Sequence, residues 1–389
     1  MGFLFGKRGS DKVSSKADSA CDAGKVAAEE SSPANAAAAK PKALVKVGRA
    51  NAAAGAAEPA SEPAAPKVSV LTPVYNVEQY LPECLDSLVA QKLKDIEFIC
   101  INDGSTDGSL AILKEYAARD SRFVIIDKAN SGYGSSMNCG LRKARGEYVG
   151  IVESDDFASP NMFRDLYKFA KRHNCDLVKA NYYAHDDTGD YFRETFAGQR
   201  YRKVFKPAKN FDAIKKPPVI WSAVYRRSML VENGIRFNET PGASFQDTSF
   251  VQRVWFTAKR AAVLKKGYLH YRLEREGSSQ KSTSKVYEVC SEFAMTEDYL
   301  RQKPAKFKRF APLLQCMKLD TYRWNFNRIV LDLRKDFMMK WAEEFRDAQA
   351  QGLLHEDLFS VEDWALVQEL LANPESCFEN HVQGFEGFE

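Results

Sequence analysis

The chain has 389 residues, of which 44% are hydrophobic and 12% aromatic, enough for the core of one or two globular domains. Its 56 basic and 52 acidic residues leave a formal net charge of +4, too balanced to indicate a nucleic-acid partner or a polybasic membrane role. The eight cysteines form no C-x-x-C pair and the five histidines lack metal-ligand spacing, which argues against a disulfide framework or zinc site and predicts a cytoplasmic protein.

The first 66 residues are rich in Ala, Ser, Pro and Lys, with almost no aromatic residue after Phe5. This composition buries too little apolar surface to offset the entropy of ordering, so residues 1–66 are predicted to be a disordered tail. Phe3 and Phe5 leave open a weak peripheral contact with the inner face of the cytoplasmic membrane. A tail without a binding role is the simpler interpretation.

Alternating strand and helix patterns begin at Lys67. Short apolar runs predict four strands, and apolar residues at helical spacing fill the segments between them. The strands are expected at 68–73, 96–101, 123–126 and 148–152. Strands separated by such helices form right-handed βαβ units. We therefore predict an α/β fold with a largely parallel sheet and flanking helices.

The rest of the chain is less regular. We expect a helix at 160–172, a strand at 177–182, a polar irregular loop at 185–216, a strand at 219–225 and a helix at 227–233. The pattern is helical from about 286 to the end. Two folded regions are predicted, an α/β domain at 67–275 and a C-terminal helical appendage at 276–389.

Polar loops follow the first three strands, at 72–76, 102–109 and 130–134, and the second and third of them contain glycine. The carboxyl ends of parallel strands lie at one edge of a sheet, which is where open α/β sheets bind ligands. One such loop would be an ordinary turn, but three at the same edge predict a pocket. The third loop lacks the last glycine of a dinucleotide fingerprint, because Met137 stands there, and the chain has no phosphate-binding P-loop sequence.

Three carboxylates follow the fourth strand within four residues: Glu153, Asp155 and Asp156. Such carboxylates repel one another and lose solvation, so a cation should offset them. A hard divalent cation that also binds a diphosphate would do so. The alternative is that these are turn acids before a helix capped by Ser159-Pro160.

Two further acids suit a reaction site. Asp103 ends a strand before Gly104, and its carboxylate could accept from the N–H of a uracil or from ribose hydroxyls. Asp247 begins a helix after a Pro-Gly loop and could act as a general base toward a hydroxyl. The alternatives are a turn aspartate for Asp103 and helix capping for Asp247.

Taken together, five motifs resemble the ordered set of family 2 glycosyltransferases. They are Thr72–Asn76, Asn102–Asp107, Asn130-x-Gly132, the Glu153–Asp156 stretch and Gln246-Asp247. The resemblance covers about residues 67–275. It implies a GT-A (Rossmann-like) fold, a nucleotide-sugar donor, a divalent metal ion and inversion at the anomeric carbon.

The resemblance also assigns roles residue by residue. It places the base and ribose against the backbone of Thr72, Pro73, Val74 and Tyr75, and the uracil against Asp103. Asn130 and Gly132 belong to the nucleotide-sugar site, Asp155 faces the ribose or sugar, Asp156 binds Mg²⁺ or Mn²⁺, and Asp247 is the catalytic base.

The sequence departs from the family pattern at two positions. Glu153 replaces the first Asp of the acidic motif, and Met137 stands where an Arg is common. Arg142 or Arg272 could supply the missing cation.

We therefore expect an inverting transferase that moves a sugar from a UDP-sugar to a hydroxyl of a saccharide, lipid-linked or glycoconjugate acceptor. Two alternatives are a sugar-phosphate nucleotidyltransferase and a nucleotide-sugar-binding module that has lost its chemistry. The first would need a Gly- and Arg-rich loop after the first strand, where the sequence has Pro73-Val74-Tyr75-Asn76.

Overall fold

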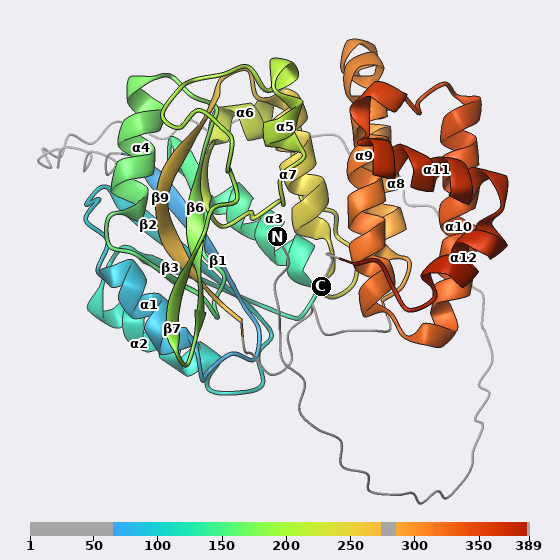
Figure 1. Cartoon of the computed structure of the whole chain (residues 1–389). Helices are drawn as coiled ribbons and strands as arrows, with labels where there is room; N and C mark the ends of the chain where they lie inside the picture. Colours follow the sequence, from blue (N-terminus) through green and yellow to red (C-terminus); the bar gives the residue numbers. More distant parts are fainter. Residues whose placement is uncertain (1–64, 274–284, 387–389) are drawn as a thin grey trace, which may run out of the picture. The chain divides into compact units, whose positions relative to one another are not determined.

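The computed structural model describes residues 65–273 and 285–386, so all but the last two residues of the predicted tail lie outside it. One sheet contains all nine described strands, in the order β3-β2-β1-β4-β8-β6-β9-β5, with β7 paired to β6 (Figure 1). The strands are β1 Val68–Val74, β2 Ile96–Asp103, β3 Phe123–Lys128, β4 Tyr148–Ile151, β5 Phe157–Ala158, β6 Leu177–Asp186, β7 Gly189–Arg193, β8 Ala223–Arg226 and β9 Ala261–Arg272.

Seven α-helices alternate with these strands: α1 Leu81–Val89, α2 Ser109–Arg119, α3 Tyr133–Lys143, α4 Met162–Arg172, α5 Phe211–Ile214, α6 Arg227–Glu232 and α7 Gln246–Thr257. Five more follow the sheet: α8 Glu288–Arg301, α9 Pro304–Arg328, α10 Leu331–Ala350, α11 Val361–Ala372 and α12 Pro374–His381. The α/β class predicted from the sequence is therefore confirmed.

The strands β3, β2, β1 and β4 are parallel neighbours, as the βαβ pattern predicts. Beyond β4 the sheet is mixed, because β8 is antiparallel to both β4 and β6, while β9 is parallel to β6. All four parallel strands thus end at the same edge. The loops that follow them are brought together there.

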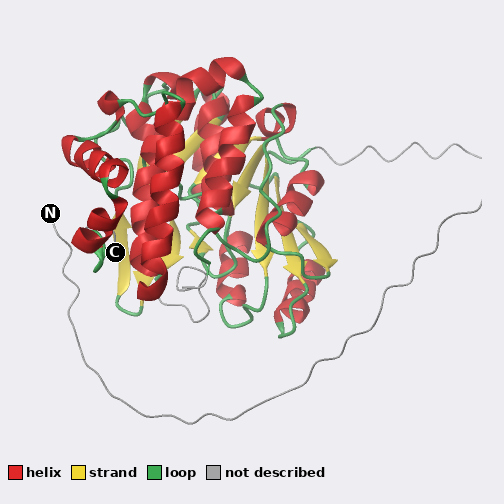
Figure 2. Ribbon diagram, turned by 90° about the vertical axis from the view of Figure 1, so that its right-hand side faces the viewer, coloured by secondary structure: helices red, strands yellow, loops and turns green. Residues whose placement is uncertain are grey.

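Helices cover both faces of the parallel part. Leu71 of β1, paired with Ile151 of β4, contacts α3 at Gly140. Gly150, the neighbour of Ile151, faces the other way, and a Cβ there would lie 2.3 Å from the ring of Phe163 in α4. Glycine at 150 therefore allows α4 to approach the sheet, and the result is a three-layer arrangement (Figure 2).

The region 185–216 is more ordered than expected. Strand β6 continues to Asp186 and turns into β7, and α5 lies within the predicted loop. The strand expected at 219–225 is confined to β8, and β9 was not foreseen. The exposed pair Lys265-Lys266 interrupts the apolar pattern of β9, close to the irregularity in its register with β6.

The helices α8–α12 form the C-terminal region and pack around Trp341 and Tyr322, both fully buried. Helix α8 contacts α7. None of the described helices is long and apolar enough to cross a membrane. The predicted domain boundary at 275/276 falls outside the described residues and stays a prediction.

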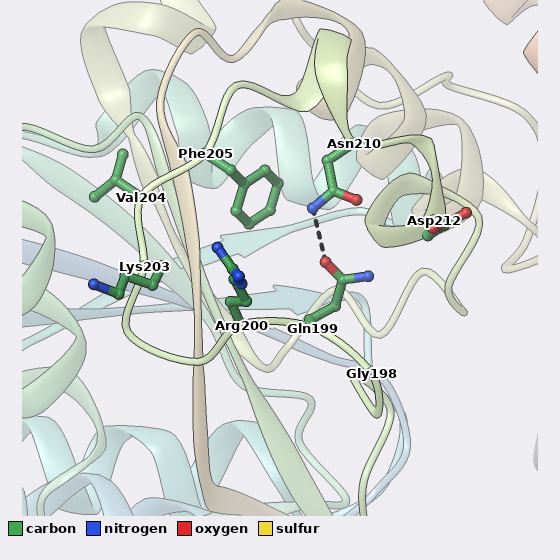
Figure 3. A pocket seen from close by; sticks show the side chains of 8 residues that line it. All are labelled: Gly198, Gln199, Arg200, Lys203, Val204, Phe205, Asn210 and Asp212. Atoms are coloured by element: carbon green, nitrogen blue, oxygen red, sulfur yellow. Dashed lines mark hydrogen bonds between the residues drawn. The ribbon is translucent and has the colours of Figure 1, made fainter.

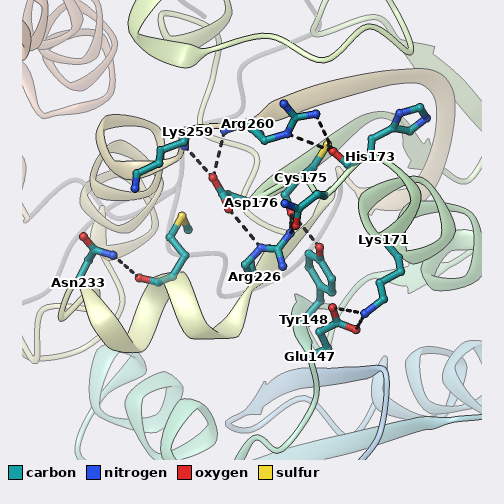
Figure 4. Close-up of polar contacts among 12 residues, drawn as sticks. Glu147, Tyr148, Lys171, His173, Cys175, Asp176, Arg226, Asn233, Lys259 and Arg260 are labelled. Atoms are coloured by element: carbon teal, nitrogen blue, oxygen red, sulfur yellow. Dashed lines mark hydrogen bonds and ion pairs between the residues drawn. The ribbon is translucent and has the colours of Figure 1, made fainter.

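A polar network centred on Asp176 lies at the opposite edge of the sheet, where β4 and β6 begin (Figure 4). Asp176 Oδ2 accepts from the backbone N–H groups of Lys259 at 2.8 Å and Arg260 at 3.1 Å. Asp176 Oδ1 lies 3.2 Å from Arg226 Nε, and the Arg226 side chain also donates to the Cys175 carbonyl. This carboxylate therefore ties together the starts of β6 and β9 and the end of β8.

Replacing Asp176 with Ala should destabilise the protein by about 2–4 kcal/mol, since two backbone donors and a guanidinium lose their acceptor. The midpoint of urea unfolding measures this loss. Lys171→Ala is the control, because its ion pair with Glu147 is largely exposed and should contribute less than about 1 kcal/mol. Equal midpoints for the two variants would contradict the assignment.

Candidate active site

The site lies at the edge where β1–β4 end, and Asp103 organises its first part. The Asp103 side chain, only 5% exposed, accepts from the backbone N–H groups of Ser131 at 2.9 Å and Gly132 at 3.0 Å. It also forms an ion pair with Lys128 at the end of β3. Asp103 thereby holds the third predicted loop against the second, in addition to the uracil contact that the family pattern implies.

The third loop meets a segment far along the chain. Gly132 has φ 89°, and a Cβ there would lie 3.0 Å from Gly242 N and 3.2 Å from Thr240 O. The N–H of Tyr133 donates to Gly242 O at 3.0 Å. Only glycine at 132 allows this approach. The third predicted loop and the loop that precedes Asp247 are therefore in direct contact.

The acidic stretch contains Asp156, a carboxylate of which only one oxygen has a hydrogen-bond donor among the described residues. Asp156 is 1% exposed, and its Oδ1 accepts from the N–H of Arg272 at 3.0 Å. Its Oδ2 is buried and has no hydrogen-bond partner within 65–273 and 285–386. Burial, followed by the charge of Asp155, raises the pKa of Asp156 well above its ordinary value. A buried oxygen without a donor, among other carboxylates, fits a hard divalent cation.

Arg272, at the end of β9, is the cation next to this stretch. Its Nε donates to the Asp155 carbonyl at 3.1 Å, and its guanidinium contacts Glu83 and lies 5.2 Å over the Tyr80 ring. Arg142 ends α3, which runs away from this edge of the sheet. Of the two cations considered for the missing Arg, only Arg272 is beside the carboxylates.

The alternative that these acids precede a helix capped by Ser159-Pro160 is wrong about the cap. After Asp156 the chain enters β5, which pairs with β9, and helix α4 begins only at Met162 with Asn161 as its N-cap residue. Ser159 does not cap α4; its hydroxyl lies 3.0 Å from His270 Nε2. The acids therefore belong to a strand connection.

Asp247 is the second residue of α7 and accepts from the N–H of Thr248 at 2.8 Å. The N-cap position belongs to Phe245, whose φ of 61° is left-handed. Burial raises the pKa of Asp247, and the nearby charge of Lys179 opposes this rise. Lys179 is fully buried in β6 and donates to the carbonyls of Pro218 and Val219. Asp247 thus combines burial with a cationic neighbour.

Two tyrosines show that the separate motifs converge. Burial, then the charges of Asp156 and Asp155 and more weakly that of Asp247, raises the pKa of Tyr271. Tyr133 donates to Glu153 Oε1 at 2.8 Å, and its pKa is raised by burial and by the charges of Glu153 and Asp247. Asp247 therefore lies near the acidic stretch, although some 90 residues separate them in the sequence.

Sequence reasoning missed an aromatic group beside these carboxylates. Trp221 stacks on Tyr271 with ring centroids 5.3 Å apart, and Tyr182 packs edge-on against Trp221 at 4.7 Å. The residues come from β6, β9 and the segment before β8, so no local motif joins them. Their only sequence signal was the aromatic character of each isolated strand pattern.

Two other features lie elsewhere. A cavity of about 450 Å³ is lined by the 198–212 segment, including Arg200, Lys203 and Phe205 (Figure 3). Phe205 bridges Ala261 at the start of β9, the opposite end of that strand from Arg272. In the C-terminal helices, Glu369, Cys377 and His381 lie together, but Glu369 already accepts from Asn380. Neither feature belongs to the strand-end site.

Comparison with known proteins identifies the class. Residues 69–234 match the model of Glycosyl transferase family 2. The uncharacterized glycosyltransferase EpsJ of Bacillus subtilis is 32% identical over 245 residues, which is 62% of this chain and 69% of EpsJ. The poly(ribitol-phosphate) beta-glucosyltransferase of Bacillus spizizenii is 30% identical over 54% of this chain, but only 33% of that protein is covered.

The fold has a counterpart among solved structures. Residues 1–349 of S. aureus TarS, crystallised in complex with UDP-GlcNAc, superpose with a TM-score of 0.66 at 20% sequence identity. The match covers 82% of this chain and 90% of that one. The fold is therefore that of the GT-A glycosyltransferases. The chain belongs to glycosyl transferase family 2, and it is a glycosyltransferase.

If Asp156 is a metal ligand, Asp156→Asn should weaken Mn²⁺ binding in the presence of UDP by at least about ten-fold, because an amide is a poorer ligand for a hard cation than a carboxylate. Titration calorimetry with MnCl₂ gives the affinity. Asp95→Asn makes the same chemical change at the opposite edge of the sheet, in an exposed pair with Lys67, and should leave the affinity unchanged. Parental Mn²⁺ affinity in Asp156→Asn would exclude this ligand.

Proposed function

We propose that the protein transfers a sugar from a UDP-sugar to a hydroxyl of a saccharide, lipid-linked or glycoconjugate acceptor, with inversion at the anomeric carbon. Family membership makes it a glycosyltransferase. The donor class is supported by the fold shared with TarS, whose crystal structures contain UDP or UDP-GlcNAc. The acceptor class is supported by relatives named for polymer substrates, the poly(ribitol-phosphate) beta-glucosyltransferase and the minor teichoic acid biosynthesis protein GgaB.

The observation that carries the proposal is that Tyr133 bonds both to the acidic stretch, through Glu153, and to the loop before Asp247, through the Gly242 carbonyl. The carboxylates brought together in this way are Asp155, Asp156 and Asp247. A transferase needs its donor diphosphate and its acceptor hydroxyl in one place. The first two carboxylates follow β4, beside the nucleotide motifs, and the third begins α7. Their proximity suits a single displacement between the two substrates.

In this proposal the loops after β1, β2 and β3 bind the nucleotide. The backbone of Thr72, Pro73, Val74 and Tyr75 lines the base and ribose, Asp103 faces the uracil, and Asn130 and Gly132 complete the nucleotide-sugar site. Asp155 contacts the ribose or sugar. A divalent cation on Asp156, Mg²⁺ or Mn²⁺, would neutralise the negative charge that develops on the departing diphosphate.

Asp247 then accepts the proton of the acceptor hydroxyl as its oxygen attacks the anomeric carbon from the face opposite the diphosphate. A single displacement of this kind inverts the configuration and requires no protein nucleophile. Burial of Asp247 keeps its proton affinity above that of an exposed aspartate, which favours proton acceptance. The N–H of Thr248, and more weakly the charge of the buried Lys179, oppose this rise in the pKa of Asp247.

Release of UDP from a panel of nucleotide sugars with Mn²⁺ present tests the function directly. Release from at least one UDP-sugar, with the anomeric configuration of the product inverted, is the expected result. The same carboxylates could serve a nucleotide-sugar-binding module without turnover. UDP binding with no release from any donor would favour that module.

Asp247→Asn should lower the turnover number by about 10²- to 10⁴-fold, because the amide cannot accept the proton. UDP affinity should stay within about two-fold of the parent, since the donor does not need the base to bind. Asn can still accept from the Thr248 N–H, so the melting temperature should hold. Asp212→Asn, at the second residue of α5, is the matched control. Near-parental turnover in Asp247→Asn would reject the base assignment.

Lys179→Met should move the acid limb of the kcat/KM profile to higher pH. Activity requires ionised Asp247, so it falls as the pH drops through the pKa of that residue. Burial lowers the pKa of Lys179 to about 7, so its charge is present on the acid side, where it lowers the pKa of Asp247. Met removes the charge and the pKa of Asp247 rises further. Lys266→Met, an exposed change in β9, should leave the limb in place.

A further inference from the structure

The loop that precedes Asp247 is held by polar and aromatic contacts with the C-terminal region. This loop, residues 238–245, precedes α7 and touches Gly132 on one side. On the other side it meets Glu292 of α8, which is only 1% exposed. Glu292 Oε2 accepts from Asn238 Nδ2 at 2.6 Å, and its Oε1 accepts from the Thr240 hydroxyl at 3.3 Å.

From Glu292 a chain of contacts reaches the residue next to the base. Thr240 Oγ1 also accepts from Gln246 Nε2 at 2.8 Å, and Gln246 immediately precedes Asp247. Asn238 Oδ1 in turn accepts from Arg253 at 2.8 Å, about two turns further along α7. Glu292 therefore connects to the first turns of α7 through both ends of its carboxylate.

Two further contacts hold the same loop. Lys285 donates to the Ala243 carbonyl at 2.8 Å. The Phe245 ring packs edge-on against Trp324 of α9 at 5.7 Å and lies 4.9 Å under the Arg328 guanidinium. Phe245 has a left-handed φ of 61°, an unfavourable conformation for a bulky residue, which persists only where the surroundings impose it. Here the surroundings are supplied by α9.

Burying a carboxylate among apolar side chains is unfavourable unless its partners compensate for the lost solvation. The partners of Glu292 lie in this loop and in α7: Asn238 and Thr240 donate to it, and Ser249 and Arg253 also stabilise its charge. We propose that Glu292 is a positioning residue for the transfer reaction. By holding residues 238–240, it orients the first turn of α7 and sets Asp247 in line with the acidic stretch. The C-terminal helices are then part of the catalytic apparatus.

This inference rests on the proposed role of Asp247, so its test needs one measurement that does not depend on turnover. In the full-length protein, Glu292→Gln preserves size but places an amide NH₂ or a neutral oxygen against Asn238 and Thr240. Amide hydrogen exchange should become faster in peptides that span 238–247 and stay parental in β1–β3. Glu297→Gln, in the same helix but paired with Arg301, is the matched control.

Kinetics give the second measurement. Turnover of Glu292→Gln, followed as UDP release from the most active sugar donor of the panel, should fall roughly ten- to a hundred-fold, as expected for a misplaced base. UDP affinity with Mn²⁺ and the melting temperature should match those of Glu297→Gln. Thr240→Val, which removes a single hydroxyl, should reproduce the direction of the effect if Glu292→Gln fails to fold.

If amide hydrogen exchange across 238–247 stays at the parental rate in Glu292→Gln, Glu292 does not hold this loop. Parental turnover with faster exchange would overturn the positioning role, and a joint loss of UDP affinity and melting temperature would make Glu292 a purely structural residue. Failure of the proposed function looks different. In that case Asp247→Asn keeps its turnover while the exchange difference at 238–247 remains.

Discussion

The arrangement of the site depends on one buried carboxylate, Asp156, whose two oxygens do not both have a hydrogen-bond donor among the described residues. Asp156 sits under β9 with one oxygen bonded to the Arg272 backbone and the other without a donor among the described residues. Such burial is costly, and like charges at Asp155 raise the cost. The sheet imposes it, because β9 pairs with β5 directly after the acidic stretch. The fold therefore favours the binding of positive charge at the edge where the four parallel strands end.

Around that point the protein provides partners in two different ways. Backbone geometry supplies some of them, as when Asp103 collects the N–H groups of Ser131 and Gly132. Distant segments supply others, as when Arg272 reaches the acidic stretch from the end of β9. The first kind is local to adjacent βαβ units. The second kind requires the mixed half of the sheet, which brings β6, β8 and β9 beside β4.

The mixed half of the sheet is also where the C-terminal helices come into contact with the proposed site. Helix α7 lies between the sheet and α8, and its first residues carry Gln246 and Asp247. Its N-terminal loop has contacts on both sides, to Gly132 in the nucleotide motif and to Glu292 in α8. Loops with few contacts open easily, whereas this one is held at several points. The proposed donor site, the proposed base and the C-terminal helices are therefore linked by contiguous contacts.

The sequence by itself determined the α/β class, the first four strands and the family, because βαβ periodicity and strand-end motifs are local signals. It also selected Asp103, Asp156 and Asp247, whose assigned roles in the reaction are still proposals. Tertiary structure alone decided that Arg272 and not Arg142 stands beside the acids, that Lys179 neighbours Asp247, and that Glu292 grips the 238–245 loop. The reason is physical. These contacts join residues from about 50 to 120 positions apart through antiparallel and mixed strand pairings and helix packing, for which no periodicity in the chain is a signal.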